Sequence, residues 1–208
     1  MEKSFGVENE GIKYICGVDE VGRGPLAGPV AVCAFLCRPD FLDFLPTTKE
    51  KKNYIRDSKK MTRKQREKWY EFLKKNKSEG KCDFAVTFVS AENIDKSGIG
   101  KCIKKALDQS IEKLRVNEKL VSIYLDGGLK APKEYIYQET IIHGDELHPV
   151  ISLASIIAKV SRDKIMYRYA EEFPEYGFDK HVGYGTRAHY DAIAKHGQLP
   201  IHRKTFIH

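Results

Sequence analysis

Four acidic residues stand where apolar, strand-like segments end, and these acids are the groups in the sequence best suited to chemistry. They are Asp19 and Glu20 after YICGV, Asp126 at the end of VSIYLD, and Asp145 after YIYQETIIHG. A carboxylate at the end of a buried strand is costly unless it is paired or bound to a metal ion. Acids that converge also raise one another's pKa, and a divalent cation between them removes that penalty.

Carboxylate oxygens are hard ligands that suit Mg²⁺ or Mn²⁺. Two such ions about 4 Å apart form the usual clamp for in-line displacement at phosphorus. The four acids therefore predict a two-metal site for phosphodiester hydrolysis. Each acid taken singly has a structural alternative, because an aspartate at a strand end commonly caps a turn or a helix.

The segments that must position these acids alternate between strand and helix patterns. Strands are predicted at 14–19, 29–37, 83–90, 121–126 and 137–144, and helices at 62–76, 91–116 with a break near Gly98, 149–170 and 187–196. Two strands follow each other directly, so we expect an α/β fold with a mixed sheet rather than a purely parallel one. We expect a core over residues 1–170 and a helical C-terminal segment over 171–208 packed on it, within one structural domain.

Positive charge is concentrated in one segment of this 208-residue chain. The whole chain carries 36 Lys and Arg against 29 Asp and Glu, a net charge of +7. Residues 49–77 alone hold 13 Lys and Arg and 4 Asp and Glu, a net charge of +9. A basic patch of this kind indicates a polyanionic partner, most often nucleic acid, and a solvated helix face is the alternative.

Other features of the composition narrow the class of protein. No apolar run reaches the roughly 18 residues of a membrane-spanning helix, and the charged N-terminus does not resemble a secretory signal. Five cysteines, an odd number, occur without a CxxC pair, which argues against a disulfide framework or a zinc knuckle. We therefore expect a monomer in a reducing cytoplasm, with no membrane partner.

Two motifs invite other functions but lack the right context. GRGPLAG resembles a dinucleotide-binding loop, yet its third glycine comes one residue late and a strand follows it instead of a helix. His143 and His148 could form part of a zinc site, but no HExxH motif is present. The intervening glycine and Pro149 argue against one helix face that carries both histidines.

A series of motifs in this sequence resembles the type 2 ribonuclease H family, specifically the ribonuclease HII group. They are, in order, GVDEVGRGPLAGPV (17–30), DSKK (57–60), LDG (125–127), GD (144–145), ISLASIIAKVSRD (151–163), HVGYGT (181–186) and HRKTF (202–206). The first block is long and specific, and the set extends over nearly the whole chain from about residue 14. The related ribonuclease HIII group, which lacks the arginine of the GRG loop, is less similar.

The resemblance implies a ribonuclease H-like mixed β-sheet flanked by helices, with a helical C-terminal subdomain. It also implies an endonuclease that acts in DNA replication and ribonucleotide excision repair. Such enzymes hydrolyse RNA in RNA/DNA hybrids and cut on the 5′ side of single ribonucleotides in duplex DNA, leaving 3′-OH and 5′-phosphate ends. The matching metal ligands and catalytic residues are Asp19, Glu20, Asp126 and Asp145, with Mg²⁺ or Mn²⁺ as the cofactor.

The resemblance further implies a pocket that senses the ribose 2′-OH. Its residues would be Gly22, Arg23 and Gly24, together with Tyr184. Glycines allow backbone groups to approach the hydroxyl, and a tyrosine offers a ring for the sugar and a hydroxyl for a hydrogen bond. Without the resemblance, Tyr184 would be interpreted as a surface tyrosine and Arg23 as part of a surface ion pair.

Five further positions are harder to interpret. Lys59 is a candidate contact for the nucleic-acid backbone. Val182 stands where the family commonly has a lysine, which puts a phosphate contact there in doubt. Asp163 lies inside a predicted helix and is interpreted as a structural ion pair or hydrogen-bond acceptor. His202 and Arg203 could brace the C-terminal segment.

Two other functions remain open on the residues alone. A different two-metal nuclease on the same kind of core would cut all-DNA duplexes, and the GRG loop and Tyr184 would then have no purpose. A non-catalytic nucleic-acid-binding module would use the basic segment, and the four acids would be caps. Dependence on metal, and cutting at a lone ribonucleotide, separate these alternatives.

Overall fold

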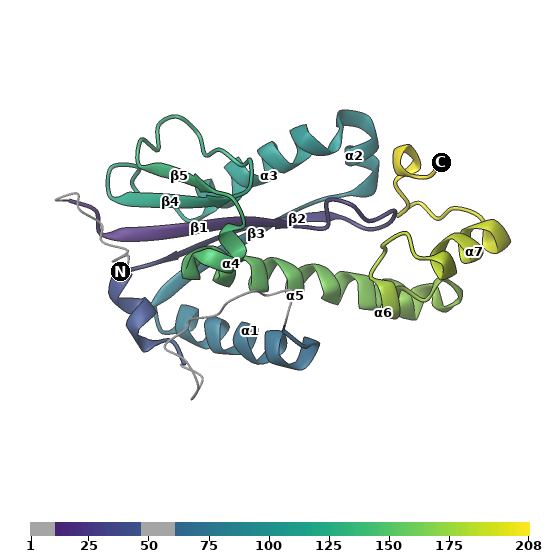
Figure 1. Cartoon of the computed structure of the whole chain (residues 1–208), viewed down its shortest axis with the longest axis horizontal. Coiled ribbons are helices and arrows are strands. Elements are labelled where there is room, and N and C mark those ends of the chain that lie inside the picture. Colours follow the sequence, from purple (N-terminus) through teal and green to yellow (C-terminus); the bar gives the residue numbers. More distant parts are fainter. Residues whose placement is uncertain (1–10, 47–60) are drawn as a thin grey trace.

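A five-stranded mixed sheet separates two layers of helices (Figure 1). The computed structural model describes residues 11–46 and 61–208. The strand order is β3-β2-β1-β4-β5. The strands are β1 (Tyr14–Val21), β2 (Val30–Cys37), β3 (Cys82–Val89), β4 (Val121–Asp126) and β5 (Gln138–Ile141). Pairing is antiparallel from β3 through β2 to β1 and parallel from β1 through β4 to β5, which confirms the predicted mixed sheet.

The helices cover both faces of the sheet, and a smaller group lies beyond one end of it. One face carries α2 (Ala91–Ser97) and α3 (Ile99–Lys113), and the other carries α1 (Arg63–Ser78) and α5 (Pro149–Glu172) (Figure 1). The short α4 (Gly144–Leu147) precedes α5, and α6 (Phe178–His181) and α7 (Arg187–His196) gather beyond its C-terminal end. Single 3₁₀ turns occur at Pro39–Phe44, Pro174–Tyr176 and Lys204–Phe206. In the described part of the chain, no helix is both long enough and apolar enough to cross a membrane.

Local sequence accounts for most of these boundaries. Thr62 accepts a hydrogen bond from the Gln65 amide and the Gln65 side chain accepts one from the Thr62 amide, a capping box that starts α1 as predicted. Gly98, at φ +80°, separates α2 from α3 at the predicted break. The strand predicted at 137–144 is shorter, because His143 adopts the left-handed conformation at φ +56°. That turn starts α4, an element that the sequence analysis missed.

Two apolar cores lie on the two faces of the sheet, and alternation along the strands assigns side chains to each. Val18 and Leu125 belong to the core under α3, whereas Ile15 and Phe35 belong to the core under α5 and α1. Every residue of β2 is buried, as expected for a strand covered on both faces. A third cluster around Phe178 joins the end of α5 to the C-terminal elements.

The approach of α5 to the sheet is closest at Gly17 of β1. A Cβ atom built on this glycine would lie 2.1 Å from the carbonyl oxygen of Val150, the second residue of α5. A glycine is therefore required for steric reasons, and the contact lies two residues before Asp19. The start of α5 is thus held against the strand that carries the first predicted metal ligand.

Three histidines lie close together in the C-terminal part, where burial keeps at least two of them neutral. His189 is fully buried, and burial lowers its pKa to about 4 from an ordinary value of 6.5. The positive charges that His181 and His202 would acquire lower it further. His202 is also buried and its pKa is lowered for the same first reason.

We predict that the same substitution at two glycines has opposite effects on stability. Gly17→Ala forces α5 away from β1 and should lower the free energy of unfolding by about 1–3 kcal/mol. Gly100→Ala, within α3, meets no atom within 4 Å and should raise it by about 0.5–1 kcal/mol. Urea unfolding followed by circular dichroism measures both values. Equal effects of the two variants would contradict the packing described at Gly17.

We predict that the protein loses stability as the pH is lowered from about 6.5 to about 4, the interval between the ordinary and the folded pKa of His189. In this interval the unfolded chain binds a proton on the ring and the folded chain does not, so the free energy of unfolding falls with pH. His189→Gln should lose less stability than the wild type over this interval. His202 and His148 add to the decline in both proteins, and the raised pKa of Asp19 and Glu20 opposes it. His196→Gln, at an exposed position, is the control and should retain the wild-type slope in urea titrations.

Candidate active site

Strand pairing brings Asp19 and Asp126 to the same edge of the sheet. In the parallel pair of β1 and β4, Val18 is opposite Leu125, so the two aspartates are neighbours at the carboxyl ends of adjacent strands. Val18 and Leu125 face the core under α3, and alternation turns the following residues toward α5. This is the convergence that the sequence predicted for the first and third acids.

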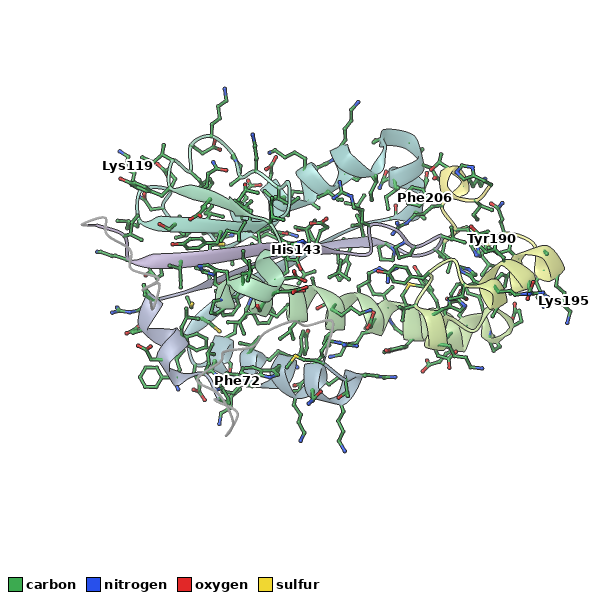
Figure 2. All side chains as sticks on the ribbon, viewed as in Figure 1. Phe72, Lys119, His143, Tyr190, Lys195 and Phe206 are labelled. Atoms are coloured by element: carbon green, nitrogen blue, oxygen red, sulfur yellow. The ribbon has the colours of Figure 1, made fainter. Side chains whose placement is uncertain are left out.

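Asp145 reaches the same place from α4 rather than from a strand. The amide of Gly144 donates a hydrogen bond to Oδ1 of Asp126 at 2.7 Å. A Cβ on Gly144 would lie 2.6 Å from Cδ1 of Ile151 and 3.3 Å from that Asp126 oxygen, so a glycine allows this close approach. Asp145 is 1% exposed, and its carbonyl accepts a hydrogen bond from the Ser152 hydroxyl at 2.6 Å. Figure 2 shows His143, just before α4, near the centre of the molecule.

The electrostatics at Asp19 place the three other acids near its carboxyl group. Asp19 is 4% exposed, and burial is the largest cause that raises its pKa well above the ordinary value. A hydrogen bond from Ser155 on α5 opposes the shift, while the charges of Asp126, Glu20 and Asp145 add to it. The three other sequence-predicted acids therefore lie within electrostatic reach of Asp19.

Glu20 forms the outer side of this cluster. Burial raises its pKa, the positive charge of Arg23 opposes that shift, and the negative charge of Asp126 adds to it. Nη1 of Arg23 lies 3.1 Å from Oε1 of Glu20, and the arginine side chain is 63% exposed. Arg23 thus partly neutralises the cluster while it remains accessible from solvent.

The donor atoms of this cluster fit a hard divalent cation in type and in charge. All are carboxylate oxygens, which suit Mg²⁺ or Mn²⁺ better than the nitrogen and sulfur ligands of structural zinc. Among the residues that the structure describes, no three His, Cys, Asp or Glu side chains already close around an ion. Instead, Oδ1 of Asp19 accepts the Glu20 amide at 2.7 Å, and Asp126 accepts that of Gly144. One oxygen of each of these two carboxylates is thus engaged by a main-chain amide.

The two histidines considered for a zinc site flank α4 in the sequence and lie in different environments. His143 precedes α4 and is exposed, whereas His148 follows it and is buried. The ring of His148 stacks on that of Tyr124, with 4.1 Å between centroids, and burial lowers its pKa to about 4. The two histidines serve as the boundaries of a short helix.

The GRG loop follows Glu20 directly, and Tyr184 belongs to a second loop that contacts the same chain segment. Gly22 has φ +92°, and a Cβ there would lie 2.2 Å from Nε of Arg162. The carbonyl of Gly183 accepts hydrogen bonds from the amides of Leu26 and Ala27, at 2.8 and 3.2 Å. Tyr184 is 43% exposed beside this junction. The GRG segment leads into β2 and not into a helix, so the dinucleotide-binding interpretation is excluded.

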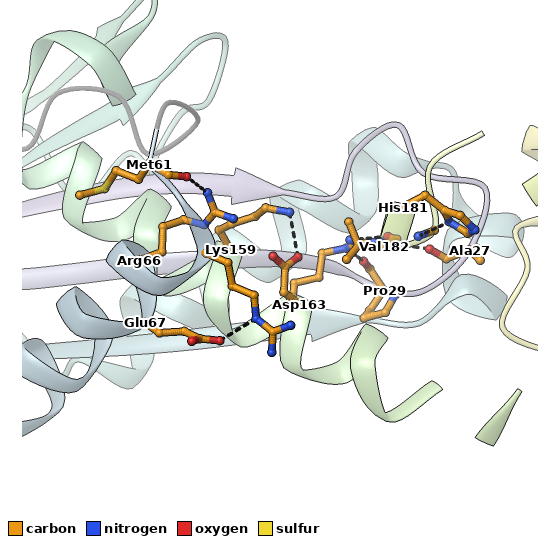
Figure 3. Close-up of polar contacts among 12 residues, drawn as sticks. Ala27, Pro29, Met61, Arg66, Glu67, Lys159, Asp163, His181 and Val182 are labelled. Atoms are coloured by element: carbon orange, nitrogen blue, oxygen red, sulfur yellow. Dashed lines mark hydrogen bonds and ion pairs between the residues drawn. The ribbon is translucent and has the colours of Figure 1, made fainter. Parts of the chain in front are cut away.

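The remaining candidates have different outcomes. Lys59 lies outside the described residues. Asp163 forms an ion pair with Lys159, 2.8 Å from Nζ to Oδ1, which agrees with a structural interpretation (Figure 3). Val182 has a left-handed backbone at φ +45°, and its carbonyl accepts a hydrogen bond from Arg162 at 2.9 Å.

The sequence analysis missed two buried polar residues, Ser155 and Arg162, and gave Arg203 only as a possible brace of the C-terminal segment. Ser155 donates a hydrogen bond to Asp19, and Arg162 and Arg203 are completely buried with their guanidinium groups bonded to loop carbonyls. The signal for Ser155 and Arg162 was a polar residue inside a helix that is otherwise apolar nearly all round. A buried polar group of this kind must have a partner.

Comparison with known proteins agrees with this geometry. A family model described as ribonuclease HII matches residues 16–208. Ribonuclease HII of Endomicrobium trichonymphae is 41% identical over 198 residues, which is 95% of this chain and 87% of that protein. The structure of the complex of PCNA with ribonuclease HII from Archaeoglobus fulgidus superposes with a TM-score of 0.73 at 25% identity, covering 93% of this chain and 95% of that one.

A more distant structure shows the same fold. Bst ribonuclease HIII in complex with Mn²⁺ superposes with a TM-score of 0.64 at 18% identity, covering 94% of this chain and 68% of that one. The family match extends over almost all of the chain and includes every one of the four acids and the GRG loop. This chain belongs to the ribonuclease HII family, the divalent-metal-dependent hydrolases that cleave RNA in RNA/DNA hybrids and excise ribonucleotides embedded in DNA.

Proposed function

We propose that Asp19, Glu20, Asp126 and Asp145 hold two Mg²⁺ or Mn²⁺ ions and are the catalytic residues of this ribonuclease. The observation that carries the proposal is the raised pKa of the buried Asp19 carboxyl, to which the three other acids contribute. Such a cluster is unfavourable without cations and becomes favourable with them. When bound, the two ions would lower the pKa of a water molecule and stabilise the oxygen that departs.

The positions of the acids support distinct roles for them. Asp19 lies between the others, since its neighbours are Asp126 on β4, Glu20 on β1 and Asp145 on α4. We assign one ion to Asp19, Asp126 and Asp145 and the second to Asp19 and Glu20. Hydrolysis by activated water requires no protein nucleophile, and it leaves 3′-OH and 5′-phosphate ends.

The GRG loop and Tyr184 are proposed to recognise the ribose at the cleavage site. Gly24 has no atom within 4 Å of where a Cβ would stand, so its backbone is open to a ligand. The exposed ring of Tyr184 can pack on a sugar and its hydroxyl can bond the 2′-OH. A site built to bond a hydroxyl strongly rejects the analogue that lacks it. Arg23, and Lys59 on the sequence alone, are assigned to phosphates of the backbone.

The proposal also covers the substrates, the oligomeric state and the cellular compartment of the protein. The substrates are RNA/DNA hybrids and DNA duplexes with single ribonucleotides, cut on the 5′ side of the ribonucleotide. All the proposed catalytic residues come from one chain, which is consistent with a monomer. The five cysteines are buried free thiols, as expected for a reducing cytoplasm.

We predict that Asp126→Asn abolishes metal-dependent cutting of a labelled duplex that contains one internal ribonucleotide. Wild-type protein should cut this duplex only with Mg²⁺ or Mn²⁺ and should leave an all-DNA duplex intact. Metal at 100 times its dissociation constant should stabilise the wild type by about 2.7 kcal/mol, and this gain should shrink in the variant. The thermal midpoint with and without Mn²⁺ measures the gain independently of activity.

The matched control is Asp108→Asn, which alters an exposed pair on α3, where Nζ of Lys104 lies 2.6 Å from Oδ2 of Asp108. This variant should cut and respond to Mn²⁺ as the wild type does. If Asp126→Asn cuts at the wild-type rate, the assignment of the metal ligands is wrong.

We predict that Tyr184→Ala slows cutting at a lone ribonucleotide by roughly 10- to 100-fold, through loss of a hydrogen bond and of ring packing. Its response to Mn²⁺ should be unchanged, because the tyrosine is not among the proposed ligands. Phe88→Ala removes a ring of similar exposure on β3 and is the control for loss of an aromatic side chain. Equal rates for Tyr184→Ala and wild type would exclude the sensing role.

A further inference from the structure

The C-terminal segment binds the GRG loop through the side chain of Arg203. This arginine is completely buried, and its guanidinium donates hydrogen bonds to three backbone carbonyls of the loop between β1 and β2. Nη2 donates to Gly22 at 2.7 Å, Nη1 to Arg23 at 2.9 Å and Nε to Gly28 at 3.0 Å. A buried cation is tolerated only when its donors are satisfied, and the planar fork of arginine matches this fixed set of oxygens.

The bonds from Arg203 determine which way the GRG peptides face. In a planar trans peptide the carbonyl and the following amide point in opposite directions. The carbonyls of Gly22 and Arg23 turn inward to the guanidinium, so the amides of Arg23 and Gly24 turn to the other side. Those amides belong to the loop assigned to the ribose.

Backbone pairing aligns the C-terminal segment with the chain that follows the GRG loop. The amide of Gly28 donates to the carbonyl of Ile201 at 2.9 Å, and the amide of Arg203 donates to that of Leu26 at 2.7 Å. Ala27 and His202 form an antiparallel bridge between these bonds. The position of Arg203 relative to the loop is therefore set by main-chain hydrogen bonds.

The neighbouring residue, His202, reaches the Tyr184 loop through a second histidine. The Leu199 amide donates to Nδ1 of His202 at 2.8 Å, so a neutral His202 carries its proton on Nε2. That proton faces Nε2 of His189 at 3.1 Å, which must accept it. The proton of His189 is then on Nδ1, 2.9 Å from the carbonyl of Tyr184. Both rings are buried. The chain of hydrogen bonds therefore runs in one direction, from His202 through His189 to the carbonyl of Tyr184.

Arg162 forms a second set of hydrogen bonds to the same two loops, at other carbonyls than those that Arg203 and His189 bind. It donates to the carbonyls of Ala27, Pro29 and Val182, which converge in the close-up of Figure 3. The Arg162 side chain also packs against Gly22, but its hydrogen bonds go to carbonyls other than those of Gly22 and Tyr184. Arg203 contacts the carbonyls of the GRG loop, and His202, through His189, contacts the carbonyl of Tyr184. Each residue thus serves one half of the proposed ribose pocket.

We propose that Arg203 and His202 are positioning residues that set the GRG loop and Tyr184 in register, so that the enzyme distinguishes a 2′-OH from its analogues. Their side-chain hydrogen bonds join main-chain groups and His189, and none goes to a proposed metal ligand. This inference rests on the proposed role of the GRG loop and Tyr184 in reading the ribose. It assigns part of substrate specificity to two consecutive residues of the C-terminal segment.

The test compares kcat/KM on two duplexes, one with a single ribonucleotide and one with a single 2′-fluoro nucleotide. Fluorine cannot donate a hydrogen bond, so the ratio of the two values measures how well the hydroxyl is recognised. The ratio does not depend on the fraction of folded protein. Arg203→Lys, which cannot reproduce the fork, should lower this ratio about tenfold or more, as should His202→Phe, which keeps a ring of similar size but breaks the chain of hydrogen bonds.

Two controls separate positioning from loss of stability and from damage to the metal site. Ser110→Ala removes a buried hydroxyl that donates to the carbonyl of Val32 at 3.0 Å, on the α3 face of the sheet. It should change stability and leave the ratio at the wild-type value. The thermal shift produced by Mn²⁺ should be retained in Arg203→Lys and His202→Phe. If Arg203→Lys does not fold, His202→Phe decides the question.

The outcomes also separate this inference from the proposed function. If Tyr184→Ala lowers the ratio and the variants at 202 and 203 do not, the positioning role is wrong and the ribose pocket stands. If none of the three variants lowers the ratio, the ribose pocket itself is wrongly assigned. If all three lower it while Ser110→Ala does not, both are supported.

Discussion

The repulsion between carboxylates at the carboxyl ends of β1 and β4, where Asp19 is buried and Asp126 half-buried, is the constraint on which the rest of this structure depends. Burial and the charges of its neighbours raise the pKa of Asp19, and a folded chain maintains such a cluster only if the surrounding packing holds it. The close contact of Gly17 with Val150 and the bonds from Ser155 and the Gly144 amide supply that support. Local stability is thereby exchanged for a cluster of like charges, and such clusters are common at functional sites.

The second organising feature is the use of buried guanidinium groups to hold irregular backbone. Arg162 and Arg203 each satisfy three carbonyls of loops that have no strand or helix partner for those groups. Loops near active sites are otherwise among the least stable parts of a fold. The proposed metal ligands are thus held by regular elements, whereas the loops proposed for substrate recognition are held by side chains from distant parts of the chain.

Residues near in sequence were easier to interpret than residues brought together by folding. The capping box at Thr62 and the break at Gly98 depend on neighbours within a few positions, so both were predictable. The left-handed turn at His143 was not, because it is an unfavourable conformation that only surrounding packing maintains. Asp145 was predicted as a site acid at a strand end, and it lies on a short helix instead because of that turn.

The sequence by itself determined the alternation of strands and helices, the four acids at their ends and, through ordered motifs, the ribonuclease HII family. These features depend on side-chain type and local periodicity, which every residue carries with it. Only the tertiary structure decided that Ser155 supports Asp19, that Arg203 binds the GRG loop and that His202 reaches Tyr184. Arg203 and the Gly22 carbonyl are 181 positions apart, and no local pattern encodes a hydrogen bond between groups that meet only after the sheet and its helices have packed.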